Sequence, residues 1–199
     1  MGRDKARLPW GESTLLEHVI ETLRPLVDEL LLVVDDAGRF RDLDIRVVED
    51  LVPGAHALGG LYTGLLAASH ERCFACACDA PFLSAGLVRL LIARADGPDG
   101  SAARYDLVIP LTPAGLQPLH AVYARSALAA IERQLRRREW DLKALVPKVR
   151  AHIVAFDEVL QADPQGLSCV NLNTPEEYAA ACALRERMMP VIDSRRGNR

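Results

Sequence analysis

Two aspartates of this chain stand where predicted β-strands end. Asp79 closes the apolar run "CFACACD", and Asp50 closes the shorter run "IRVVED". Ligands of open α/β sheets bind at the carboxyl ends of the strands, so both carboxylates are expected at the binding edge. One or two carboxylates hold Mg²⁺ while substrate phosphates complete its shell, so the pair predicts a site for a divalent cation and phosphates. The alternative for Asp79 is a turn-forming or helix-capping role.

Lys5 is the candidate phosphate partner of this site. Its flexible ammonium group can neutralise charge that moves onto a leaving phosphate. A lysine so close to the start of a chain is ordinarily just solvated, and its position alone favours that second role. The assignment of Lys5 to the site therefore needs support from the surrounding sequence.

Two asparagines near the end of the chain add amide groups. In "CVNLN", Asn171 and Asn173 alternate with Val170 and Leu172. Strand alternation places both amides on one face, where they can converge on a ligand or complete a metal shell. Local turn and capping work is the alternative, above all for Asn173.

Three cysteines, a glutamine and a histidine could also bind a metal or a substrate, but a structural role explains each of them at least as well. Cys73, Cys76 and Cys78 fall in a short apolar segment typical of a strand buried on both faces, where cysteine behaves as a small hydrophobe. Alternation points Cys76 and Cys78 to one side of that strand and Cys73 to the other, which weakens a shared zinc site. Gln117 and His120 lie beside an apolar strand, and a lone histidine in that setting is more often structural.

Apolar periodicity and turn residues divide the chain into alternating strands and helices. Helices are expected over 14–26, 84–94 and 126–138 and at "LGGLYTGLLAASH" and "TPEEYAAACALRERMM", and strands at "ELLLVVDD", "IRVVED", "CFACACD", "DLVIPLT", "LQPLHAVYA" and "AHIVAF". Thr14 with Glu17, and Thr174 with Glu177, predict capping boxes at two helix starts. The order predicts an α/β fold of three layers, with a mostly parallel sheet covered on both faces. The runs "ELLLVVDD" and "CFACACD" are expected to be buried strands.

Composition restricts the class of protein. The 199 residues, 50% hydrophobic and 26% charged, suit one domain, expected over 1–190, with 191–199 as a flexible tail. A net charge of −3 lacks the basic footprint of a nucleic-acid-binding protein. No apolar run approaches the ~20 residues of a membrane helix, and the charged start lacks the apolar stretch of a signal peptide. We therefore expect a cytoplasmic protein with neither nucleic acid nor membrane as partner.

Five ordered segments carry a resemblance to a known family. "MGRDKARLPW", "VVEDLVPGAHALGGLYTGL", "CDAPFL", "LQPLHAVY" and "VNLNTPEEY" follow the order and spacing of molybdenum cofactor guanylyltransferases. The resemblance runs from Gly2 to about Ala181. It implies a Rossmann-like nucleotidyltransferase fold that transfers GMP from GTP to the terminal phosphate of molybdenum-bearing molybdopterin, releasing pyrophosphate with Mg²⁺ present. It also admits molybdoenzyme maturation proteins as partners.

The resemblance implies roles for particular residues. Lys5 matches a lysine that contacts the nucleotide and acts in catalysis, and Asp79 matches the catalytic aspartate that holds Mg²⁺ at the nucleotide. Asp50 and Gly60 match nucleotide-binding positions. Asn171 and Asn173 fall in the family's C-terminal asparagine motif, which is associated with the second substrate.

The start of the chain departs from the family pattern. That pattern places a strand and a Leu-Ala-Gly-Gly type loop ahead of the Met-Gly-x-Asp-Lys motif that opens here at Met1. "MGRDK" then corresponds to the end of a phosphate-cradling loop that works through backbone N–H groups. We therefore expect the first strand to be missing, translation to start upstream, and a 199-residue product to bind GTP poorly. His56 and Ala57, where the family usually has Gly-Pro, weaken the case for guanine.

Three functions stay open on the sequence. The first is guanylyl transfer to molybdopterin. The second keeps the fold and metal but changes base or acceptor, as in cytidylyl transfer to molybdopterin. The third is a non-catalytic remnant that binds molybdopterin or a partner enzyme.

Overall fold

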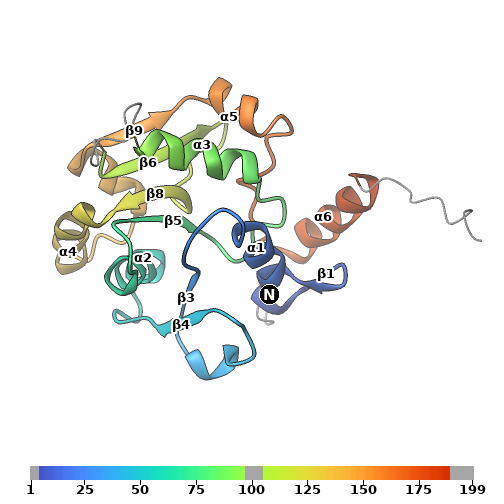
Figure 1. Ribbon diagram of the computed structural model, residues 1–199, viewed down its shortest axis with the longest axis horizontal. Helices are drawn as coiled ribbons and strands as arrows, with labels where there is room; N and C mark the ends of the chain where they lie inside the picture. The colour runs from blue at the N-terminus through green and yellow to red at the C-terminus, as the bar shows by residue number, and fades with distance from the viewer. Residues whose placement is uncertain (1–4, 97–104, 189–199) are drawn as a thin grey trace, which may run out of the picture.

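Strands and helices alternate along the chain in the computed structural model, which describes residues 5–96 and 105–188 (Figure 1). The helices are α1 Leu15–Leu23, α2 His56–Ala67, α3 Ala85–Asp96, α4 Leu128–Arg136, α5 Phe156–Ala162 and α6 Pro175–Met188, with 3₁₀ turns η1 Lys5–Arg7, η2 Ala37–Phe40, η3 Arg125–Ala127 and η4 Leu142–Lys148. The strands are β1 Pro9–Trp10, β2 Ser13–Thr14, β3 Leu31–Val34, β4 Arg46–Glu49, β5 Arg72–Cys76, β6 Leu107–Thr112, β7 Gly115–Leu116, β8 His120–Ala124 and β9 Ala151–Val154. The loop expected at "GPDGSA" and the tail expected at 191–199 lie outside the described residues. Within the described part, no helix is long and apolar enough to cross a membrane.

The main sheet is mixed. Its strands follow the order β5-β8-β6-β7, and β9 also pairs with β6. β8 is antiparallel to both β5 and β6, whereas β9 is parallel to β6. β3 and β4 form a separate parallel pair. The α/β class is confirmed, but the expected mostly parallel sheet is corrected, because residues 113–114 turn the chain back from β6 into β7 and β8 keeps this reversed direction, so both lie antiparallel to β6.

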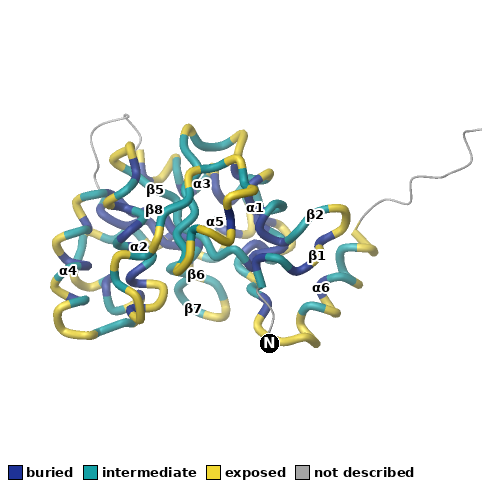
Figure 2. Tube along the Cα trace, turned by 90° about the horizontal axis from the view of Figure 1, so that it is seen from below, coloured by how far each residue is buried: buried dark blue, intermediate teal, exposed yellow. Residues whose placement is uncertain are grey.

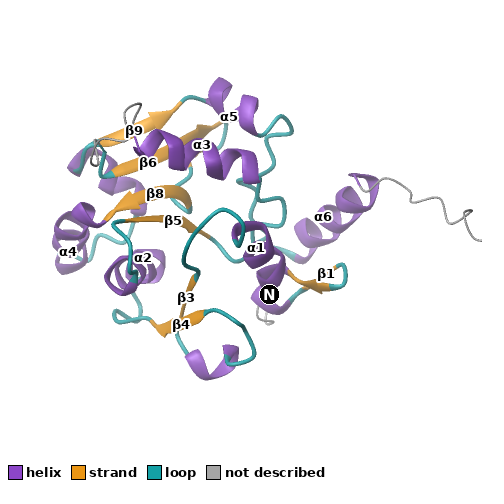
Figure 3. Ribbon diagram, viewed as in Figure 1, coloured by secondary structure: helices purple, strands orange, loops and turns teal. Residues whose placement is uncertain are grey.

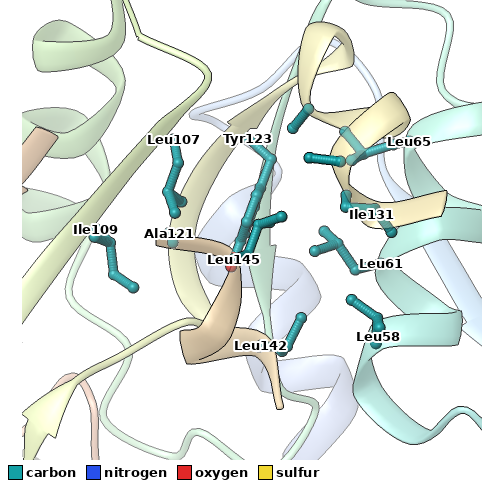
Figure 4. Close-up of a cluster of buried hydrophobic side chains, with 12 residues drawn as sticks. Leu58, Leu61, Leu65, Leu107, Ile109, Ala121, Tyr123, Ile131, Leu142 and Leu145 are labelled. Atoms are coloured by element: carbon teal, nitrogen blue, oxygen red, sulfur yellow. The ribbon is translucent and has the colours of Figure 1, made fainter. Parts of the chain in front are cut away.

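Helices cover both faces of the main sheet, which gives the expected three layers (Figure 3). Alternate residues of the central strands face opposite layers, since successive strand side chains point to opposite faces. Leu107 of β6 and Tyr123 of β8 pack with α2, α4 and η4 in the cluster that Figure 4 shows. Val108 and Val122, one residue along each strand, pack instead with α3 and α5.

Both predicted capping boxes are present. Thr14 Oγ1 accepts a hydrogen bond from Glu17 N at 3.3 Å, and Glu17 Oε2 accepts one from Thr14 N at 2.7 Å. Thr174 and Glu177 exchange the same two bonds, both at 3.1 Å. Because these bonds satisfy backbone donors that a helix start leaves free, they determine where α1 and α6 begin.

The expected burial of two strands is wrong. β8 is buried along its whole length, but every residue of β3 and β5 is only half-buried, although both strands are largely apolar. Cys73 and Cys76 do face opposite sides of β5, as alternation predicts. Both strands line a groove, which accounts for their partial exposure.

The start and end of the described chain pack on each other. Leu8, Trp10 and Leu15 share a buried cluster with Leu172 and with Ala181 of α6. Ala181 is the one fully buried residue described in α6, and Figure 2 shows most of this helix as exposed or intermediate. This cluster holds the N-terminal residues beside the segment that leads into α6.

A charged cluster joins three strands at the edge remote from this contact. Asp106, just before β6, accepts hydrogen bonds from Arg150 N at 3.0 Å, from Arg150 Nη2 at 2.8 Å and from Ser126 Oγ at 2.5 Å. Its backbone oxygen accepts the N–H of Ala124 at the end of β8. The pKa of Asp106 is held well below its usual range, mainly by the hydrogen bonds from Arg150.

Replacing Asp106 by Asn should lower the free energy of unfolding at pH 7 by about 1–3 kcal/mol, since hydrogen bonds to a charged group are lost. Because the folded-state pKa is depressed, the stabilisation is complete above the unfolded value of about 3.9 and disappears as pH falls through the folded value. Denaturant unfolding of both chains at pH 7 and below pH 3 measures this difference. Asp44→Asn, at an exposed carboxylate, is the control. An equal loss in both variants would contradict the role of Asp106.

Candidate functional site

Residues from the start, middle and end of the chain meet at one point. Lys5 Nζ lies 3.3 Å from Asp79 Oδ2 and donates a hydrogen bond of 3.0 Å to Asn173 Oδ1. Asp79 is 9% exposed, and Lys5 is partly buried beside it. Lys5 therefore has a specific partner in the structure, which goes against the simple solvated role that its position alone favoured.

The fold places Asp79 in a turn just after β5, three residues beyond its last residue, Cys76. The backbone oxygen of Asp79 accepts the N–H of Leu172 at 3.2 Å, which binds the C-terminal segment to this turn. Leu172 is 1% exposed and anchors the segment in the core. Glu177 Oε2 accepts the N–H of Asn173 at 2.6 Å, so the cap of α6 also orients this residue.

The segment "CVNLN" is not a strand, which corrects the expectation that strand pairing positions its asparagines. It is an irregular connection held by Asp79 and by the cap of α6. Asn173 still reaches the site through its side-chain oxygen. The Oδ1 atom of Asn171 is buried without a hydrogen-bond partner among the described residues. Such an atom is costly unless a ligand, ion or water binds it.

The donor set at Asp79 suits a hard cation that keeps other ligands. Asp79 Oδ1 accepts no hydrogen bond from the described residues, and the carboxyamide oxygen of Asn173 lies beside the same lysine. No group of three or more His, Cys, Asp or Glu side chains that could hold a metal is found in the described part. Mg²⁺ fits one carboxylate because it binds few protein ligands and completes its shell with water and substrate phosphates.

Asp50 belongs to a second cluster, at the end of β4. Its Oδ1 accepts hydrogen bonds of 2.9 Å from Val52 N and from Thr63 Oγ1, while Thr63 Oγ1 accepts one from Leu51 N at 3.0 Å. Thr63 is buried within α2. These bonds brace the loop between β4 and α2, so the carboxylate has a structural role in addition to any contact with a ligand.

Two neighbouring glycines of α2 differ in their surroundings. A Cβ atom on Gly59 would lie 2.8 Å from the backbone oxygen of Val52 and 2.9 Å from Asp50 Oδ2. A Cβ atom on Gly60 would meet nothing within 4 Å. Gly59 is thus needed for packing, whereas Gly60 faces open space in the groove that Asp50 also lines.

His56, the first residue of α2, has a φ of 52°. Side chains other than glycine rarely adopt this left-handed backbone conformation. The glycine that related sequences were expected to carry here therefore suits the backbone better than the histidine of this chain.

The two clusters are separate. Among the residues that the structure describes, no hydrogen bond or ion pair joins Asp50 to Lys5, Asp79 or Asn173. The predicted residues thus form a charged centre at Asp79 and a second position near the start of α2. A ligand that contacted both would have to span the distance between them.

Sequence reasoning undervalued three polar residues around these clusters. Thr63 orients Asp50, and Glu177, recognised as a cap, also orients Asn173. His120 is 1% exposed and its Nε2 is buried without a hydrogen-bond partner in the described part. Burial lowers the pKa of His120, opposed in part by hydrogen bonds to the backbone of Leu119 and Ser168 and, to a smaller extent, by the nearby carboxylates of Asp163 and Asp79. No spacing rule links Asp50 with Thr63, so only the fold reveals that contact.

Comparison with known proteins identifies the class of this arrangement. The sequence model of the MobA-like NTP transferase domain matches residues 1–152. The chain belongs to this family. The matched region contains Lys5, Asp50, Gly60 and Asp79, while both asparagines lie beyond it.

Individual relatives agree with this family. A probable molybdenum cofactor guanylyltransferase from Chloroflexus aggregans is 38% identical over 183 residues, which cover 88% of this chain and 84% of that protein. The structure of molybdopterin-guanine dinucleotide biosynthesis protein A from Archaeoglobus fulgidus has a TM-score of 0.80 at 21% identity, covering 94% of this chain and 93% of that one. Rv0371c from Mycobacterium tuberculosis, solved as a complex with manganese, has a TM-score of 0.59 at 19% identity over 92% and 93% of the chains. These structures confirm the nucleotidyltransferase fold.

The two glycines give a matched pair of variants. Gly59→Ala should lower the free energy of unfolding by about 1–3 kcal/mol, because the new methyl group overpacks against backbone. Gly60→Ala should leave the fold intact and raise the free energy of unfolding by up to about 1 kcal/mol, since alanine favours a helix more than glycine does. Denaturant unfolding measures both values. Equal effects in the two variants would contradict the packing described for Gly59.

Proposed function

We propose that this chain transfers GMP from GTP to the terminal phosphate of molybdenum-bearing molybdopterin, which forms molybdopterin guanine dinucleotide and releases pyrophosphate. The observation that carries this proposal is the contact of Lys5, Asp79 and Asn173 at the end of β5. The family membership and the names of its relatives supply the reaction class and the substrates. The cytoplasm is the location that accompanies this function.

The reaction needs little covalent work from the protein. An oxygen of the terminal phosphate of molybdopterin attacks the α-phosphorus of GTP, and the bond from that phosphorus to the oxygen bridging the β-phosphate breaks. The electron pair leaves with pyrophosphate. Catalysis then consists of aligning the two anions and stabilising the charge that moves onto the leaving group.

Lys5 supplies the positive charge in this scheme. Its contacts with Asp79 and Asn173 hold the ammonium group at a defined place in the partly buried site. A preorganised cation in such a place stabilises developing negative charge more strongly than a solvated one. The phosphates of the nucleotide are expected to compete with Asp79 for this lysine.

Asp79 would hold the divalent cation, with the amide oxygen of Asn173 nearby on the same lysine. Mg²⁺ is the ion that we propose, because a single carboxylate with neutral oxygens and phosphates is its usual protein environment. When bound, the cation polarises phosphate oxygens and neutralises their charge. The related protein solved with manganese supports a divalent ion in this fold.

The remaining predicted residues would bind the two substrates. Asp50 and Gly60 line the same groove at the start of α2 and would contact the nucleotide, Gly60 because it leaves room for a close approach. The buried, unpartnered Oδ1 of Asn171 would bind the second substrate together with Asn173.

Asp79→Asn should reduce kcat for dinucleotide formation by about 100-fold or more, the size of effect seen when one preorganised electrostatic group is removed. Product formation from GTP and molybdopterin with Mg²⁺ measures this loss, and circular dichroism confirms that the variant folds. Asp44→Asn, the same chemical change at an exposed position, should keep full activity. Equal activity in the wild type and in Asp79→Asn would contradict the catalytic role and favour a non-catalytic binding protein.

Nucleotide choice separates guanylyl from cytidylyl transfer. We expect GTP to exceed CTP in kcat/KM by at least about 10-fold, because a site that hydrogen-bonds one base leaves polar groups unpaired with another. Parallel turnover of the two nucleotides at equal Mg²⁺ measures the ratio. A higher kcat/KM with CTP would contradict guanylyl transfer and assign cytidylyl transfer instead, with the same fold and the same metal.

A further inference from the structure

His120 is buried at the end of the sheet that carries the candidate site. It is the first residue of β8 and pairs with Cys76, the last residue of the antiparallel β5, so it lies beside the strand end that leads to Asp79. Its ring meets Phe74 edge-on, with 6.2 Å between the ring centroids, and the residue is only 1% exposed. A side chain so deeply buried acts on a substrate only through its neighbours.

Packing alone would favour an apolar residue in place of His120. Its Nε2 atom has no hydrogen-bond partner among the described residues, and a buried polar atom without a partner is costly. A phenylalanine would pack against Phe74 without that cost. The imidazole is therefore better explained by the polar contacts that it does make, which are hydrogen bonds to the backbone of the adjacent Leu119 and of the distant Ser168.

Ser168 anchors the connection that leads to the two asparagines of the site. Its backbone N–H donates a hydrogen bond of 2.8 Å to Asp163 Oδ2, and its Oγ accepts the N–H of Ser84 at 2.9 Å. Asp163 follows α5 directly, and Ser84 directly precedes α3. Together with the contact from His120, these bonds hold the fully buried Ser168 between two helices and β8.

The connection from Ser168 to Asn173 is irregular and has no strand pairing to fix its course. Beyond Ser168, it is next held at Leu172, whose N–H donates to the backbone oxygen of Asp79 at 3.2 Å. Asn171 lies between these two anchors, with its Oδ1 atom buried and unpartnered within the described part. The position of this amide therefore depends on how firmly both anchors are held.

We propose that His120 is a positioning residue for the second substrate, because through Ser168 it fixes the segment that presents Asn171 and Asn173 to the phosphorylated acceptor. This inference rests on the proposed function, which assigns both asparagines to that substrate. Groups that position a substrate must be held closely, since small displacements reduce the rate strongly. Nucleotide binding at the second cluster does not depend on His120, because hydrogen bonds within α2 and the loop after β4 hold that cluster.

His152 provides a matched control at the other end of the sheet. It lies on β9 opposite Val108, near the start of β6. Both β5 and β6 are antiparallel to β8, so the start of β6 is remote from the strand end that leads to Asp79. The Nε2 atom of His152 is also buried without a partner in the part of the chain that the structure describes, and its ring stacks on Tyr105 with 4.9 Å between centroids.

The test compares His120→Phe and His120→Gln with His152→Phe in the full chain. Phenylalanine keeps a ring but removes the hydrogen bond to Ser168, whereas glutamine keeps a side-chain N–H donor. Turnover with Mg²⁺ gives kcat and separate KM values for GTP and molybdopterin. Amide hydrogen exchange over residues 167–173 is measured without substrates, so this second measurement does not depend on the reaction.

Ser168→Ala tests the same anchor from its other side. It removes the Oγ atom that accepts the N–H of Ser84 but leaves His120 in place. It should change both measurements in the same direction as His120→Phe, and it keeps the test valid if circular dichroism shows that His120→Phe does not fold.

We expect His120→Phe to raise KM for molybdopterin by about 10-fold or more while KM for GTP stays within about 2-fold. Amide exchange over residues 167–173 should become about 10-fold faster, because the segment opens more readily without its anchor. His120→Gln should recover most of both effects, and His152→Phe should show neither.

Equal rises in the two KM values would overturn the proposal, since a general loss of structure would explain them. Unchanged exchange over residues 167–173 in His120→Phe would overturn it too, as would a glutamine variant no better than the phenylalanine variant. If the wild type forms no product from GTP and molybdopterin, the proposed function fails, and the exchange data then decide by themselves whether His120 holds this segment.

Discussion

The turn at Asp79 is the contact on which the site depends. Its carboxylate pairs with Lys5 near the start of the chain, and its backbone oxygen binds the N–H of Leu172 near the end. A buried carboxylate is costly unless a positive charge or hydrogen-bond donors compensate it. The need to satisfy Asp79 therefore brings together segments that are 74 and 168 residues apart along the chain from Lys5.

Contacts that stabilise the fold also position the side chains of the candidate site. The cap of α6 orients Asn173 through Glu177, and the buried cluster around Trp10 keeps η1 near α6. A loss of packing at the end of the chain would thus displace an amide of the site. The second cluster follows the same rule, since Thr63 braces the loop that carries Asp50 while Gly59 leaves room for it.

The groove beside β3 shows the opposite situation: within the described residues one edge of β3 and one edge of β5 stay unpaired, and the apolar side chains of both strands are only half-buried. The β5-β8-β6 part of the sheet is covered on both faces by helices, so its core does not depend on β3. β3 and β4 are held instead by α2 and by the cluster of Leu16 and Ile20 of α1 with η2. Among the residues that the structure describes, no strand pairing joins the two parts of the strand layer, so they are linked mainly through helices.

Local features of the sequence were sufficient for much of the fold. Both capping boxes, the alternation of Cys73 and Cys76 across β5, and the positions of the main helices follow from spacing and side-chain type, because these act over a few residues. The strand-end positions of Asp50 and Asp79 were recognised for the same reason, and a family resemblance linked them with Lys5, Gly60 and the two asparagines.

Contacts between distant segments were decided only by the tertiary structure. The antiparallel β8, the irregular course of "CVNLN", the half-exposed β3 and the division of the predicted residues into two clusters depend on which strands pair and which edges stay free. Apolar composition shows that a strand can be buried, but not whether a neighbour is there to bury it. The sequence by itself thus determined the elements and the family, while the fold decided that Lys5, Asp79 and Asn173 meet, because a buried charge must find its partners in space.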